Sequence, residues 1–99
     1  MAINDRVSNV LHFMQGESRR IAEATEKLAR ALTAPGHIDA TLWSECKGCL
    51  ARVQYARTEI SDIAQLGCTP RQSGTMFDYF YDYQIVVRKL SKLMYPNTY

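Results

Sequence analysis

The sequence predicts an all-α fold in which three helices form an antiparallel bundle, two of them long and the C-terminal one shorter. Apolar residues recur at steps of three and four through three separate segments, which is the spacing of one helix face. No segment sustains the alternation of a strand, and no Asn-Gly or Asp-Gly pair offers a hairpin turn. Short connections between the segments make consecutive helices antiparallel.

The composition is that of one ordered domain spanning residues 1–99, with 46% hydrophobic and 22% charged residues. A formal net charge of +2 is too small to indicate nucleic-acid binding. Length and composition argue against a large enzyme fold, a membrane span and a polybasic binder. The 3 cysteines, without a recognisable export signal, indicate reduced thiols in a cytoplasmic protein.

The first helix is expected at about residues 3–32. Its apolar positions keep a four-three rhythm: Ile3, Val7, Val10, Met14, Ile21, Ala24, Leu28 and Ala31. One layer of this pattern is not apolar, because Glu17 and Ser18 occupy it. At the neighbouring Gly16 the helix either continues or breaks. The Pro-Gly pair within residues 33–37 then ends the helix, because the residue before a proline is driven out of the helical region.

The second helix is expected at about residues 39–66, as one unbroken rod of roughly 42 Å. Its seam consists of Leu42, Cys46, Cys49, Val53, Ala56, Ile60 and Ile63. Asp39 is placed to cap the N-terminus, and Gly67 is placed to follow the last turn.

The third helix is expected at about residues 75–94, after a loop at residues 68–74 that contains Pro and Gly. Its seam consists of Met76, Tyr79, Tyr83, Val86, Leu90 and Leu93. Thr75 is the predicted N-cap, and Pro96 stops the helix.

A third helix of this length falls short of the other two by about 10 Å. The hairpin end that it leaves uncovered carries the apolar residues Leu32, Ile38, Leu42 and Trp43. Two coverings are open at this stage: the tail at residues 95–99 folds over Trp43 and its neighbours, or a partner does.

Two helices carry more apolar surface than one seam uses. Phe77, Tyr81 and Ile85 form a stripe roughly opposite the seam of the third helix. Tyr55 ends a second stripe on the middle helix, which otherwise has small residues. These stripes either fill a wide three-helix core or receive a helix from another copy or another protein. Aromatic residues are the usual anchors of such contacts, and the predicted interface residues are Phe77, Tyr81, Ile85, Trp43 and Tyr55.

Cys46 and Cys49 form a Cys-x-x-Cys motif, which is found in redox pairs and in halves of zinc sites. Both lie inside the expected middle helix and on its seam, where a free cysteine behaves as a small hydrophobic residue. Cys68 lies 19 residues beyond Cys49, or roughly 28 Å along a continuous helix, too far to share a metal ion. Core packing is therefore the favoured interpretation of the motif.

Other polar groupings carry weaker signals. Asp78 and Asp82 stand four residues apart, but nothing in the sequence predicts a cleft around them, so we expect them to be solvated. Arg19 and Arg20 alternate with acidic residues, which is typical of a solvated, ion-paired helix face. No grouping predicts a catalytic site or a cofactor site.

The sequence thus predicts a small non-enzymatic helical protein that binds another protein through helix faces, as a regulator, inhibitor, chaperone or adaptor. We expect a homodimer that completes the bundle, because two-fold dimers are the commonest oligomers. We expect no cofactor, no membrane contact and no nucleic acid. The alternative is a thiol-redox switch or metal-binding protein that uses Cys46 and Cys49.

Overall fold

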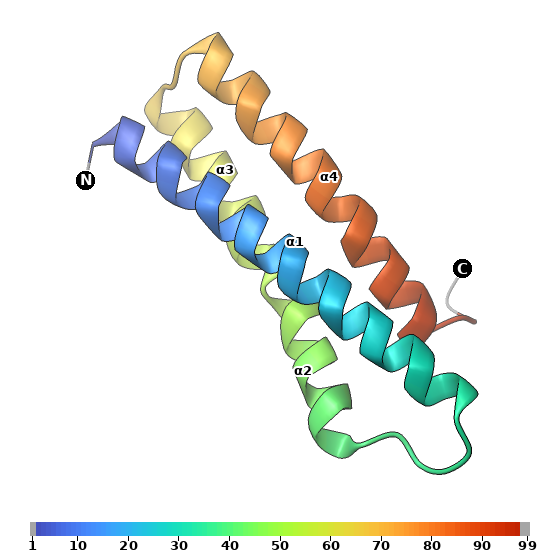
Figure 1. The fold of residues 1–99 in the computed structure, drawn as a ribbon. Helices are drawn as coiled ribbons and strands as arrows, with labels where there is room; N and C mark the ends of the chain where they lie inside the picture. Colours follow the sequence, from blue (N-terminus) through green and yellow to red (C-terminus); the bar gives the residue numbers. More distant parts are fainter. Residues whose placement is uncertain (1, 98–99) are drawn as a thin grey trace.

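The computed structural model describes residues 2–97, and all regular secondary structure within them is helical. The elements are α1 (Ile3–Thr33), α2 (Ala40–Ala51), α3 (Val53–Leu66) and α4 (Pro70–Met94). Three rods pack together, since α2 and α3 follow one another along a single rod (Figure 1). The molecule is elongated, at 51 × 26 × 16 Å.

Helix α1 is continuous over 31 residues and passes through Gly16 without a break. Gly16 is exposed and no side chain fills the space beside it, so its missing Cβ leaves no gap in the core. The helix ends where the sequence predicts. Ala34 is extended (φ −87°, ψ 148°), as Pro35 requires, and Gly36 adopts a φ of 118° that favours glycine.

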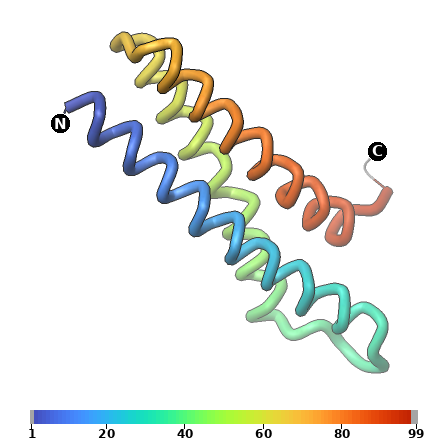
Figure 2. Tube along the Cα trace, turned by 45° about the horizontal axis from the view of Figure 1, so that its top comes forward, coloured from blue at the N-terminus to red at the C-terminus, as the bar shows by residue number. Residues whose placement is uncertain are grey.

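The expectation of one unbroken helix over residues 39–66 is corrected at a single position. The rod divides at Arg52, where the N–H of Tyr55 donates to the Arg52 carbonyl 3.1 Å away, only three residues back. This tighter turn separates α2 from α3 without a connecting loop, so the trace runs on through the junction (Figure 2). The two ends are as predicted, because the Asp39 side chain accepts from the N–H of Thr41 at 2.9 Å and Gly67 follows α3.

Helix α4 begins at Pro70, five residues before the expected start at Thr75. Thr69 Oγ1 accepts from the N–H of Gln72 (3.1 Å), and Gln72 Oε1 accepts from the N–H of Thr69 (2.9 Å). This reciprocal capping box, with a proline in the first turn, starts the helix inside the segment expected to be a loop. Gln72 also donates to Asn4 Oδ1 (2.7 Å), which ties the start of α4 to the start of α1.

One core runs the length of the molecule and includes residues from all four helices. Its buried apolar members are Val7, Val10, Met14, Ile21, Ala24, Leu28, Cys46, Cys49, Val53, Ala56, Ile60, Ile63, Met76, Tyr83, Leu90 and Met94. Helix α1 contacts the other three and shares its largest contact with α4 (Figure 1). Most positions of the three predicted seams are buried in this core. The exceptions, which are only partly buried, are Ile3, Ala31, Leu42, Tyr79, Val86 and Leu93.

The hairpin end is partly covered by the residue that follows α4. The ring of Tyr95 packs edge-on against Trp43, with centroids 6.0 Å apart and an interplanar angle of 73°. Trp43 and Ile38 are half-buried against the core, whereas Leu32 stays exposed. The first part of the tail thus covers Trp43, and residues 98–99 lie outside the described part of the chain.

Within residues 2–97, none of the helices combines the length and the apolar character that a membrane crossing requires.

Candidate protein-binding face on α4

Three large apolar side chains stand in a row on the outer face of α4. Phe77 is 59% exposed, Tyr81 68% and Ile85 41%. Residues two apart on a helix point in nearly opposite directions, so Tyr83 is fully buried while Tyr81 faces solvent. We call Phe77, Tyr81 and Ile85 the α4 stripe. No other helix of the described chain lies over it.

Exposed charges flank the α4 stripe unevenly. Asp78 and Asp82 lie beside its N-terminal half, and Arg88, Lys89 and Lys92 follow its C-terminal end. Among the described residues, none of these five forms an ion pair. The face therefore presents an apolar centre with an acidic end and a basic end.

The two other predicted interface residues lie apart from the α4 stripe. Tyr55 on α3 is 52% exposed, and its ring packs edge-on against Phe13 of α1 at 4.7 Å between centroids. Trp43 on α2 packs against Tyr95, which directly follows the C-terminus of α4. The structure thus brings together three of the five residues, and the remaining two belong to separate contacts within the chain.

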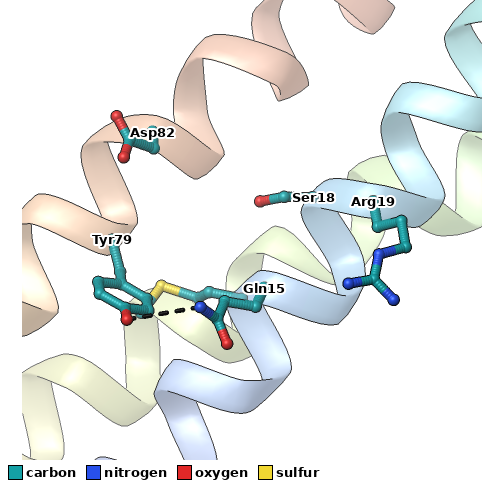
Figure 3. A pocket seen from close by; sticks show the side chains of 6 residues that line it. Gln15, Ser18, Arg19, Tyr79 and Asp82 are labelled. Atoms are coloured by element: carbon teal, nitrogen blue, oxygen red, sulfur yellow. Dashed lines mark hydrogen bonds between the residues drawn. The ribbon is translucent and has the colours of Figure 1, made fainter.

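A shallow groove between α1 and α4 borders this face (Figure 3). Its lining residues are Met14, Gln15, Ser18, Arg19, Tyr79 and Asp82. Gln15 Nε2 donates a long hydrogen bond of 3.4 Å to the Tyr79 hydroxyl. The side chains of Asp82 and Arg19 point in different directions in Figure 3, so the polar groups of the groove do not converge on one point.

The two thiols of the Cys-x-x-Cys motif point into the core. Cys46 and Cys49 are both fully buried, and burial raises the pKa of each thiol, which favours the protonated form. Cys68 is half-buried beyond the end of α3. Within residues 2–97, no three Cys, His, Asp or Glu side chains come close enough to hold a metal ion together.

A buried polar cluster connects α1 to the α2–α3 rod near the α2–α3 junction, and sequence reasoning missed it. Glu17 of α1 is only 4% exposed, and its carboxylate accepts from Arg52 Nε at 2.6 Å and from Arg20 Nη1 at 3.1 Å. Arg52 also donates to Cys49 Sγ at 3.3 Å. The sequence contains a signal for this cluster. A carboxylate at a seam position, such as that of Glu17, needs a cationic partner, and Arg52 is next to a seam residue of the middle rod.

The guanidinium of Arg52 lies close against Gly48. A Cβ at Gly48 would stand 3.2 Å from Arg52 Nη1, so the glycine leaves room for the side chain that reaches Glu17. On the α4 side, the buried hydroxyl of Tyr83 has no hydrogen-bond partner in the described structure. Burial, followed by the negative charge of Glu17, raises the pKa of Tyr83 to about 12.

Comparisons of the chain with protein-family models, with curated proteins and with solved structures found no match.

Proposed function

We propose that this chain is a non-enzymatic helical protein that binds another protein through helix faces, and chiefly through the α4 stripe. In this role it acts as a regulator, inhibitor, chaperone or adaptor. The observation that carries the proposal is the exposure of Phe77, Tyr81 and Ile85 in one continuous row. Clustered exposed apolar side chains mark interaction sites on folded proteins, whereas scattered single ones do not.

The energetics support a contact at this face. Full burial of a large apolar side chain is favourable by about 1.5–3 kcal/mol relative to its exposure, before the entropic costs of association are subtracted. Two of the three residues are aromatic, and aromatic side chains anchor protein interfaces more often than other types. The acidic and basic ends of the face supply a polar rim around the apolar centre.

The proposal includes the finer architecture of the bundle. In Figure 1, α1 and α4 run in the same direction, and the α2–α3 rod, which lies between them in the sequence, runs in the opposite direction. This course of the chain supports an antiparallel order of consecutive rods. A helix pairing with the α4 stripe would complete the bundle by dimerisation. The three unpaired thiols support a reducing compartment such as the cytoplasm.

Site-specific photocrosslinking in an extract of the native host tests the proposal. A photoreactive amino acid at Tyr81 is expected to form adducts with a polypeptide, either a second copy or another protein. The same group at Glu23, an exposed residue of α1, serves as the matched control and is expected to form none. Equal adduct formation at both positions, or none at Tyr81, would contradict the proposed function.

A further inference from the structure

We propose that the occupant of the α4 stripe is a second copy of this chain, paired antiparallel about a two-fold axis at the level of Tyr83. This inference rests on the proposed function, because it names the partner of the same face. It is carried by two charged residues of α4, Asp78 and Lys89, which come opposite each other when the helix is paired with a reversed copy, while Asp82 near the axis comes opposite the uncharged Gln84.

On one flank of the α4 stripe, an acidic residue, Asp78, lies towards the N-terminus and a basic residue, Lys89, lies towards the C-terminus. Asp78 and Lys89 are eleven residues apart, so at about 100° per residue they point within about 20° of each other. Both are exposed, and neither has an ion-pair partner in the part of the chain that the structure describes. Arg71, the other exposed cation of this flank, lies further towards the N-terminus, beyond the apolar stripe.

Two pairs of residues, one apolar and one charged, have nearly the same midpoint along α4. The midpoint between Tyr81 and Ile85 is residue 83, and the midpoint between Asp78 and Lys89 falls between residues 83 and 84. An antiparallel pair centred there places Tyr81 of each copy against Ile85 of the other. The same register places Asp78 of each copy against Lys89 of the other, as a self-complementary two-fold contact requires.

A parallel pairing lacks this match, because it sets Asp78 against Asp78 and Lys89 against Lys89, which repel each other. Arg88 is eleven residues after Phe77 and so lies on the same flank, and in the antiparallel register the ring of Phe77 comes opposite the aliphatic stem of Arg88 of the other copy. The contact is small beside the roughly 800 Å² per partner of a standard interface, so the dimer is expected to be reversible and concentration-dependent.

Sedimentation equilibrium of the purified chain over a broad concentration series tests the inference. The wild-type chain is expected to pass from monomer to dimer. Asp78→Lys and Lys89→Asp each set two like-charge contacts across the axis, so each is expected to weaken the dimer about tenfold. Glu23→Lys makes the same change of charge as Asp78→Lys, but on α1, and is expected to leave the dissociation constant unchanged.

A mixture of the two single variants gives the sharpest test. In a heterodimer of Asp78→Lys with Lys89→Asp, both charge contacts join opposite charges, so dimer formation is expected to return to the wild-type level. The chain that carries both substitutions is expected to recover its homodimer for the same reason. Circular dichroism checks that each variant keeps the wild-type helical content.

Two results would overturn the inference: a wild-type chain that stays monomeric throughout the series, or single variants whose mixture dimerises no better than either alone. A monomeric chain whose Tyr81 probe still forms adducts with a different polypeptide would overturn the second copy and the completion of the bundle by dimerisation, and would leave standing the binding of another protein through the α4 stripe. A monomeric chain whose probe forms no adducts would overturn both the inference and the proposed function.

Discussion

The carboxylate of Glu17 stabilises the fold because two cations reach it from different parts of the chain. Arg20 approaches from the next turn of α1, and Arg52 approaches from the α2–α3 junction. Burial of a lone carboxylate would be strongly unfavourable, and the guanidinium of Arg52 would in turn lose its best partner without Glu17. The pair therefore joins α1 to the α2–α3 rod at the level of Arg52.

Replacement of Glu17 by Ala is expected to lower the free energy of unfolding by about 2 kcal/mol, since it leaves Arg52 partly buried without its anion. Glu26→Ala removes an exposed partner of Arg30 and is the matched control, with an expected change of less than about 0.5 kcal/mol. Urea unfolding measures both. Equal changes in the two variants would contradict this account of Glu17.

Tyr83 makes stability depend on pH in the alkaline range. Its pKa rises from 10.0 to about 12 in the folded state, so the native protein keeps a proton that the unfolded chain loses. The resulting stability is present below about pH 10 and is lost as the pH rises towards 12.

Tyr83→Phe is expected to remove this loss. Because the buried hydroxyl lacks a partner, the variant should be as stable as the wild type at neutral pH, or up to about 1 kcal/mol more stable. The difference between the two proteins, measured by urea unfolding at a series of pH values, should grow between pH 10 and 12. A constant difference over that interval would show that Tyr83 titrates as it does in the unfolded chain.

At the scale of the elements, the sequence predicts the end of a helix correctly where a single residue restricts the backbone or caps it. Pro35 and Gly36 end α1, Asp39 caps α2, and Gly67 follows α3. The start of α4 at Pro70 differs from the predicted start at Thr75, because the Pro and Gly within residues 68–74 suggest a loop. A proline in the first turn does not break a helix, because its missing N–H would have no helical partner there.

The two candidate caps of α4 can be separated by mutation. Thr69→Ala removes a side chain that accepts from the backbone of Gln72, so we expect a loss of about 1 kcal/mol in the free energy of unfolding. Thr75→Ala is the control, because Thr75 lies inside the helix and bonds back to the Arg71 carbonyl. Its expected effect is close to zero, and a larger loss for Thr75 than for Thr69 would place the true helix start at Thr75.

At the scale of the whole molecule, heptad spacing predicts three packed rods but not how each one is rotated. The seam of α4 and its outer stripe both have helical spacing, so the sequence alone allows either to face the core. The structure buries Tyr83 and exposes Tyr81, because contacts with α1 and with the α2–α3 rod determine the rotation of α4. Such contacts join residues far apart in the chain, so the local spacing of apolar residues does not predict them.

The central claim is that the α4 stripe is a contact surface and not part of the core. Equilibrium unfolding of the Phe77→Ala, Tyr81→Ala double variant at dilute protein concentration tests it most directly, with Tyr83→Ala as the matched core substitution. We expect the double variant to keep its helical content and lose less than about 1 kcal/mol, as surface substitutions do. Tyr83→Ala should lose about 3–5 kcal/mol. A double variant that unfolds, or that loses as much as Tyr83→Ala, would show that the stripe belongs to the core.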